Sequence, residues 1–172
     1  MTSIIKVNTI QDAGGNALLT SDGSGSITTN NIGGQNTPSF LVYQSSAQSI
    51  NNATNTTITF DTEVYDTDNA FASNKFTVPS GEGGKYVFSF AVRQSNNTQN
   101  RLYADLVDNG GNSRATFENG NGGAYDSVGS SVILSLSAGD TMELKFYQNC
   151  GTSNNTQPGA NNTYFGGFKL II

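Results

Sequence analysis

From Phe40 to the end of the chain, apolar and polar residues alternate in short runs separated by glycine, asparagine and serine. The clearest run is Tyr86-Val87-Phe88-Ser89-Phe90-Ala91-Val92, in which every second side chain is large and apolar. Such alternation places Tyr86, Phe88 and Phe90 on one face of a strand, because successive side chains point to opposite sides of a sheet. No segment has the 3.6-residue period of a long helix. The pattern therefore predicts an all-β domain.

The same pattern predicts ten short strands, bounded by turn residues. This number and spacing are typical of an antiparallel sandwich. The segment Asp108-Asn109-Gly110-Gly111 is the clearest hairpin turn among them. The predicted strands are Phe40–Val42, Thr57–Phe60, Glu63–Tyr65, Lys75–Pro79, Tyr86–Val92, Arg101–Val107, Ser113–Phe117, Ser131–Leu136, Thr141–Tyr147 and Thr163–Ile172.

Residues 1–36 differ from residues 37–172, and we expect the domain boundary between them. Their apolar positions are few and lie between glycine-rich turns. One copy of such a segment buries too little apolar surface to offset its ordering entropy. We expect it to pack on copies of itself, dock on a partner, or stay a flexible leader. Our interpretation is a β or extended attachment segment, with attachment residues Ile5, Val7, Ile10, Leu18, Leu19 and Ile27.

Charge and composition exclude several kinds of partner. The net charge is −5 with 8 Lys and Arg, so we expect no nucleic acid, which needs clustered cations. No run approaches the length of a membrane span, so we expect no membrane insertion. The N-terminus lacks the pattern of a signal peptide, and a single cysteine, Cys150, cannot form an intrachain disulfide. We expect a chain that is made and folded in a reducing cytoplasm, without export by the standard route.

Catalysis has little support in the sequence. Histidine is absent, which removes the commonest general base, and Cys150 has no histidine to activate it. A glycosidase-type carboxylate pair is the remaining enzymatic alternative, but nothing selects a pair among the 13 acidic residues. We predict no catalytic residue.

One acidic cluster suits a metal ion. Asp66, Asp68 and Asn69 carry the oxygen ligands that calcium prefers in loops. The alternative is a solvated turn that these side chains cap. Calcium is the one cofactor that the sequence suggests.

Two polar loops, 111–123 and 151–162, are dense in asparagine, threonine and glutamine. Amide and hydroxyl groups beside an aromatic ring suit sugar recognition, through hydrogen bonds and stacking. The alternative is a polar surface that keeps an assembled particle soluble. The candidate ligand-binding residues are Asn119, Asn121, Tyr125, Asn154, Asn155 and Asn161.

Five motifs follow one another over residues 37–172: Phe40-x-Val42, Tyr65-Asp66, Phe76 to Phe88, Leu136 to Asp140, and Phe165 to Phe168. Their order and spacing resemble the globular head of the complement C1q and tumour-necrosis-factor family. The resemblance implies a ten-stranded jelly roll that assembles as a homotrimer by a cyclic, heterologous contact. It also implies that trimerisation buries the central aromatic face. The residues that it implies in the core or at the subunit contact are Tyr86, Phe88, Phe90, Phe165 and Phe168.

The leader departs from that family, since it has no Gly-X-Y stalk. Its segments Lys6–Ile10 and Gly23–Thr28 are similar to leaders of fibre-like proteins from marine and cyanobacterial viruses. Together the resemblances imply a non-enzymatic, trimeric structural protein at the surface of a bacteriophage virion. Residues 1–36 would bind other virion proteins, and the head would contact a host-surface glycan as a short fibre or reinforce the capsid as a decoration. The alternatives are a free carbohydrate-binding module and a glycan-degrading enzyme.

Overall fold

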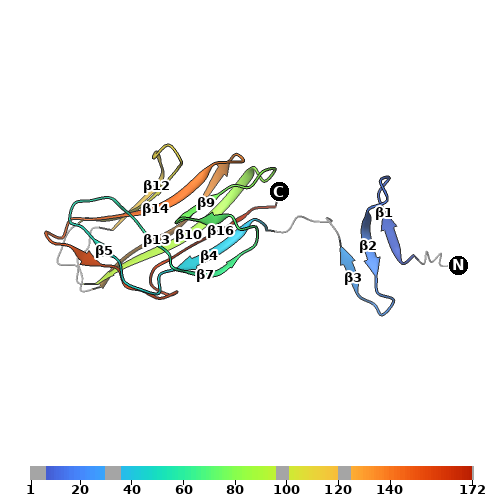
Figure 1. The fold of residues 1–172 in the computed structure, drawn as a ribbon, viewed down its shortest axis with the longest axis horizontal. Coiled ribbons are helices and arrows are strands. Elements are labelled where there is room, and N and C mark those ends of the chain that lie inside the picture. The colour runs from blue at the N-terminus through green and yellow to red at the C-terminus, as the bar shows by residue number, and fades with distance from the viewer. Residues whose placement is uncertain (1–6, 30–35, 96–100, 120–124, 172) are drawn as a thin grey trace. The chain divides into compact units, whose positions relative to one another are not determined.

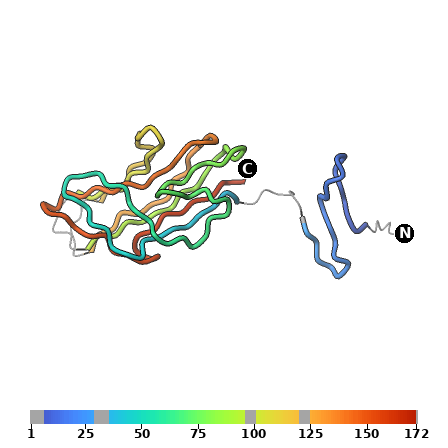
Figure 2. Tube along the Cα trace, in the orientation of Figure 1, coloured from blue at the N-terminus to red at the C-terminus, as the bar shows by residue number. Residues whose placement is uncertain are grey.

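The computed structural model describes residues 7–29, 36–95, 101–119 and 125–171, and every regular element within these ranges is a strand. Within the same ranges no helix is long and apolar enough to cross a membrane. The chain divides into two compact units, one essentially of residues 1–35 and the other of residues 36–170. Figures 1 and 2 show the two units, which we describe separately.

The N-terminal unit is an antiparallel meander of three short strands, β1 (Thr9–Gln11), β2 (Ala17–Ser21) and β3 (Ile27–Thr29). Acidic side chains hold its two turns: Asp12 accepts the Asn16 amide at 2.9 Å, and Asp22 accepts the Ser24 amide at 2.7 Å. Of its side chains whose burial is described, at residues 7–28, none is buried. The meander therefore owes its shape to local hydrogen bonds and not to a core.

The C-terminal unit is a sandwich of two antiparallel sheets. The first sheet has the order β13 (Tyr125–Leu136), β10 (Gly84–Ser95), β16 (Tyr164–Lys169), β4 (Ser39–Tyr43) and β7 (Thr62–Asp66). The second has the order β12 (Ser113–Asn119), β11 (Leu102–Val107), β14 (Thr141–Gln148), β9 (Lys75–Thr77) and β8 (Phe71–Ala72), and β6 (Thr56–Thr57) also pairs with β14. A separate pair joins β5 (Ser49–Ile50) to β15 (Asn154–Asn155).

The prediction of an all-β jelly roll is confirmed, and each predicted strand has a counterpart in the sandwich. The predicted number of strands is too low, because β5, β8 and β15 were not foreseen. Each of these has two residues, which is too short for an alternation to show. The strand β13 begins at Tyr125 instead of Ser131, because its polar first half pairs with β10 as far as Ser95.

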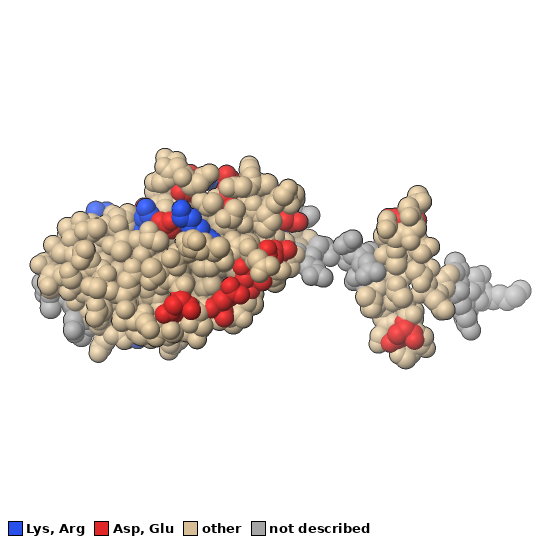
Figure 3. All heavy atoms as spheres, in the orientation of Figure 1, with Lys and Arg blue, Asp and Glu red and all other residues tan. Residues whose placement is uncertain are grey.

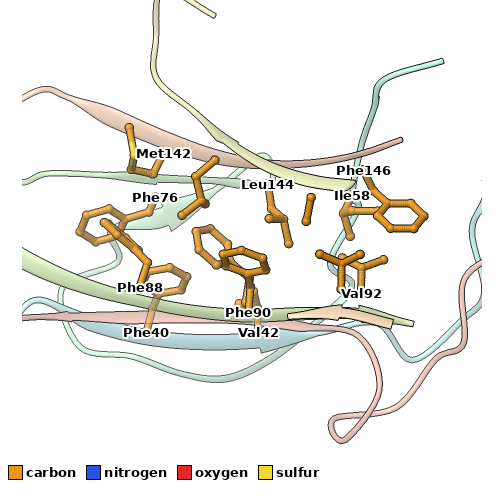
Figure 4. Packing of buried hydrophobic residues seen from close by; sticks show 14 of the residues in the cluster. Phe40, Val42, Ile58, Phe76, Phe88, Phe90, Val92, Met142, Leu144 and Phe146 are labelled. Atoms are coloured by element: carbon orange, nitrogen blue, oxygen red, sulfur yellow. The ribbon is translucent and has the colours of Figure 1, made fainter. Parts of the chain in front are cut away.

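The core fills the space between the two sheets. The side chains of Tyr86, Phe88, Phe90 and Val92 all point into it from β10 and are at most 1% exposed. Figure 4 shows three of these facing Met142, Leu144 and Phe146 from β14 of the second sheet. The Phe40 ring lies 5.0 Å from the rings of both Phe76 and Phe165. Aromatic pairs at such distances stabilise a core beyond the area that they bury.

Candidate functional site

The outer face of the first sheet carries large apolar side chains among serines and glycines. Strand pairing aligns Val87 and Ala91 of β10 with Phe168 and Tyr164 of β16, and all four lie on the side away from the core. Ile133, on the edge strand β13, is 60% exposed, and Tyr65, on the other edge strand, is 46% exposed. Exposed apolar side chains gathered on one face mark a site of interaction. We name as the outer band the apolar residues Leu41, Tyr43, Tyr65, Val87, Ala91, Ile133, Tyr164 and Phe168.

A hollow of about 160 Å³ lies in the middle of the outer band, above Gly166. A Cβ atom at Gly166 would come within 3.0 Å of both the Leu41 side chain and the Phe40 carbonyl oxygen. The glycine therefore keeps the hollow open. Its walls include Leu41, Tyr65, Val87, Tyr164 and Phe168, so it suits an apolar side chain of a partner.

The predicted aromatic residues fall on two sides of the first sheet. Tyr86, Phe88, Phe90 and Phe165 are at most 1% exposed inside one chain, so an assembly has nothing left to bury there. The expectation that trimerisation covers this face is therefore corrected: the second sheet of the same chain already covers it. Phe168 instead belongs to the outer band, opposite Val87.

Tyr86 illustrates the structural role of the inner face. Its hydroxyl donates to the Glu82 carbonyl oxygen at 2.6 Å. Burial of the ring raises the pKa of the Tyr86 hydroxyl to about 12. The side chain therefore stays neutral and anchors the turn before β10.

Buried glutamines hold the loop-bearing end of the sandwich. Gln44 and Gln148 are at most 1% exposed, yet both amides are bonded. Gln44 Nε2 donates to the Thr59 carbonyl at 2.9 Å, and Gln148 Nε2 donates to the Ile50 carbonyl at 2.9 Å. The Thr156 hydroxyl donates to Gln44 Oε1 at 2.6 Å. Satisfied buried amides of this kind fix the loops to each other and to the sheet.

Sequence reasoning missed this network, although one signal was present. Gln94 and Gln148 continue the inward alternation of β10 and β14, and the structure buries both completely. Gln94 Nε2 donates to the sulfur of the buried Cys150 at 3.6 Å.

A polar cluster lies at the same end of the outer face, on β10, β13 and the loop before β16. The Arg93 guanidinium carbon lies 5.0 Å from the centre of the Tyr125 ring. Arg93 Nη1 donates to Asn162 Oδ1 at 3.0 Å, and Asn162 Nδ2 donates to the Pro158 carbonyl at 2.8 Å. We name Arg93, Tyr125 and Asn162 the Arg93 cluster. Its first and last members escaped prediction, because their contact joins β10 to the loop before β16, which are far apart in the sequence.

The predicted ligand-binding residues do not form one site. Asn119 ends β12 and donates to the Ser127 carbonyl at 3.1 Å, and Asn121 lies outside the described residues. Asn154 and Asn155 form β15 against β5, and Asn161 lies exposed in a turn. Among the six residues, Tyr125 joins the Arg93 cluster.

The structure uses the predicted calcium residues as a turn. Both carboxylate oxygens of Asp66 accept backbone amides, from Ala70 at 2.9 Å and from Phe71 at 2.7 Å. Asp68 accepts the hydroxyl of the neighbouring Thr67, and Asn69 adopts a positive φ of 49°. The part of the chain that the structure describes contains no group of three or more acidic, cysteine or histidine side chains placed for a metal ion. The geometry favours the capped turn over calcium.

Acidic residues nearby line a hollow at the edge of the sandwich, where Figure 3 shows acidic side chains along β7. The hollow is about 390 Å³ in volume, and its walls include Phe60, Asp61, Glu63 and Asn74. Hydrogen bonds from Ser45, chiefly from its backbone amide at 2.6 Å, lower the pKa of the Asp61 carboxyl. Asp61 is thus tied to the β4–β5 connection.

The predicted attachment residues leave apolar surface on the meander. Val7, Ile10 and Ile27 are 52%, 45% and 66% exposed, whereas Leu18 and Leu19 are half-buried. A hollow of about 120 Å³ lies between strands β1, β2 and β3, and Val7, Ile10, Leu19 and Ile27 contribute to its walls. Ile5 lies outside the described residues.

Comparison with known proteins identifies the sandwich. The globular domain of zebrafish complement 1qA shares its fold, with 19% sequence identity and a TM-score of 0.59 over 78% of this chain and 98% of that chain. Murine APRIL at pH 8.0 is similar as well, with 15% identity and a TM-score of 0.61 over 77% of this chain and 98% of that chain. Eiger TNF from S. frugiperda has 12% identity and a TM-score of 0.57 over 77% of this chain and 92% of that chain. No curated protein matches the chain. The model of the C1q domain family matches residues 39–170. This match covers most of the chain, which therefore belongs to the C1q domain family.

Proposed function

We propose that this chain is a non-enzymatic, trimeric structural protein of a bacteriophage virion. The N-terminal meander attaches it to other virion proteins, and the C1q-type sandwich is displayed as a short fibre head or a capsid decoration. The observation that carries the proposal is the exposure of Val7, Ile10 and Ile27 on a meander that buries none of its described side chains. Small sheets without a core need cover from another molecule to hold their shape.

The outer band supports the trimeric part of the proposal. Its eight residues carry no charge, and charged side chains of β10 flank it, with Lys85 toward one end and Arg93 toward the other. A cyclic contact among three copies would cover the band and its hollow on every copy at once. Apolar area removed from water is the main favourable term in such an assembly.

Particle incorporation tests the attachment role. Phage particles are produced with the full chain, with residues 37–172 alone, or with the double substitution Ile10→Ser and Ile27→Ser, and each particle is analysed by mass spectrometry. We expect the full chain in particles and the other two absent. The matched control is Val64→Ser, which changes a residue on the head that is 53% exposed and should incorporate normally. Incorporation of residues 37–172 at the full level contradicts the proposal.

The Arg93 cluster favours a second candidate, a free carbohydrate-binding module. Its stacked guanidinium and ring resemble the groups that bind sugars through hydrogen bonds and ring contacts. A free module has no use for an attachment segment. This candidate predicts that the full chain and residues 37–172 bind cells equally and behave alike in solution. It also predicts that both are absent from particles.

A further inference from the structure

Arg93 is a cation without an acidic partner. Five of the described cations form ion pairs: Lys75 and Lys145 with Glu143, Lys169 with Glu82, Arg101 with Glu118, and Arg114 with Asp108. Among the described residues Arg93 and Lys85 form none, and of these two only Arg93 stacks on an aromatic ring. The acidic side chains of the sandwich all lie within the described ranges, and none of them forms an ion pair with Arg93.

The same chain shows what a stacked arginine of this kind binds. The Arg101 guanidinium carbon lies 4.9 Å from the centre of the Tyr103 ring, close to the 5.0 Å between Arg93 and Tyr125. Arg101 also donates two hydrogen bonds to the Glu118 carboxylate, at 2.8 and 3.0 Å. The planar fork of a guanidinium matches a carboxylate in this two-bonded geometry. Arg93 stacks on Tyr125 in the same way, but no carboxylate of the described residues accepts hydrogen bonds from its guanidinium.

The backbone holds Arg93 in a fixed position. The Gln157 amide donates to the Arg93 carbonyl at 2.7 Å, and the Arg93 amide donates to the hydroxyl of the buried Thr163 at 3.3 Å. One of the five guanidinium donors is bonded to Asn162, which leaves others for a ligand. A site held in this way loses little conformational freedom when it binds.

We propose that the Arg93 cluster binds the carboxylate of an acidic sugar, either a hexuronic acid or a nine-carbon sialic-acid-type sugar. The inference rests on the proposed display function, and it names the class of glycan that the head contacts. Tyr125 is 58% exposed, so its ring offers a surface on which a sugar ring can stack. The neighbours are small and polar: Ser127 pairs with Arg93, and the Ser95 hydroxyl donates to the Asn155 carbonyl at 3.0 Å. A sugar with several hydroxyl groups fits these surroundings better than an apolar peptide side chain.

Titration calorimetry of the full chain tests the assignment. The probes are methyl glucuronide, N-acetylneuraminic acid, methyl glucoside and sodium acetate. We expect at least one acidic sugar to bind, and methyl glucoside and acetate to bind at least about tenfold more weakly, since each lacks one half of the recognised group. The relative affinities of the two acidic sugars decide between a hexuronic acid and a sialic-acid-type sugar. Failure of both to bind overturns the proposal, and so does binding of acetate as tight as that of the acidic sugars.

Variants of the chain locate the binding. Arg93→Gln and Tyr125→Ala should each weaken the acidic sugar at least about tenfold, because each removes a charge-assisted or stacking contact. Arg101→Gln is the matched control, since the Glu118 carboxylate already accepts the hydrogen bonds of the Arg101 guanidinium. This variant should bind the acidic sugar like the unchanged chain. Unchanged binding by Arg93→Gln contradicts the proposal. Particle incorporation of Arg93→Gln should be normal, so loss of sugar binding and loss of the virion role are separate results.

Discussion

The sandwich and the meander are built from the same kind of strand but are stabilised in opposite ways. In the sandwich, β10 presents a row of side chains that are at most 1% exposed, and a second sheet covers them. In the meander, β1 has no covered face, and Ile27 on β3 is 66% exposed. Strand pairing alone therefore does not make a stable unit: one region is complete within a single chain, and the other needs a partner.

The outer band extends this contrast to the sandwich itself. Its inner face is closed by the same chain, whereas its outer face carries the exposed Ile133 and Tyr65 around an open hollow. Substitutions on the inner face should change folding, and those on the outer face should change assembly.

Phe88→Ala should have the largest effect. The Phe88 ring lies 5.6 Å from Phe76 and 5.9 Å from Phe165, and it is completely buried. Truncating a buried phenylalanine typically lowers the free energy of unfolding by about 3–5 kcal/mol. Urea unfolding followed by tyrosine fluorescence measures the loss.

Ile10→Ala is the comparison for this experiment, since it changes an exposed residue of the meander. Ile10 is not part of the core cluster of the sandwich, so the substitution should change the free energy of unfolding of the sandwich by less than about 0.5 kcal/mol. A decrease in the free energy of unfolding comparable to that of Phe88→Ala would show that the two units fold as one. That result would contradict the contrast between the sandwich and the meander.

Phe168→Ser should leave the sandwich folded and weaken its assembly. The burial of one phenylalanine side chain contributes about 1.5–3 kcal/mol, so association should weaken by roughly 10- to 100-fold. Sedimentation equilibrium measures the change. Tyr103→Ser is the control, because Tyr103 stacks on Tyr147 at 4.7 Å on the second sheet, outside the outer band. If both variants associate like the unchanged chain, the outer band is not the assembly face.

Gly167→Ala tests how tightly the inner face is closed. A Cβ atom at Gly167 would lie 2.6 Å from Phe88 Cδ1 and 2.8 Å from the Val87 carbonyl oxygen. Overpacking of this kind typically costs about 1–3 kcal/mol of stability. Gly83→Ala is the matched control, since its nearest neighbour would be at 3.5 Å, an ordinary contact. Thermal unfolding should separate the two variants, and equal melting temperatures would contradict the description of the core.

The smallest predicted effect is local and concerns the second turn of the meander. Hydrogen bonds from Ser24, first from its hydroxyl and then from its amide, lower the pKa of Asp22 from 3.8 to about 2. A lowered pKa means that the charged carboxylate stabilises the folded turn, so this contribution is complete above 3.8 and is lost as the pH falls toward 2. Carbon-detected NMR titration of the Asp22 carboxyl should give a midpoint below 3.8, and a midpoint at or above 3.8 would mean that the turn does not form.

Alternation predicted the sandwich because its longer strands have one face in the core and the other face outside it. The inward row of β10 and the hairpin at Asp108 follow directly from residue order, and the Gly111 amide donates to the Asp108 carbonyl at 2.9 Å as a turn requires. The direction of Phe168 was also available from the sequence: it lies three positions after Phe165, and an odd separation in a strand means opposite faces.

Other parts of the site depend on tertiary pairing and leave no local pattern. The first half of β13, Tyr125 to Ser130, is polar and becomes a strand because β10 offers a partner edge. The meeting of Arg93 with Tyr125 and Asn162 follows from that register and from the loop that Gln157 ties to β10. A single sequence carries no signal for such contacts between distant segments.

Light scattering of the full chain in solution tests the central claim most directly. The proposed assembly predicts a stable species of about three times the 18.1 kDa of one chain at micromolar concentration. A stable species of 18.1 kDa at the same concentration would contradict it.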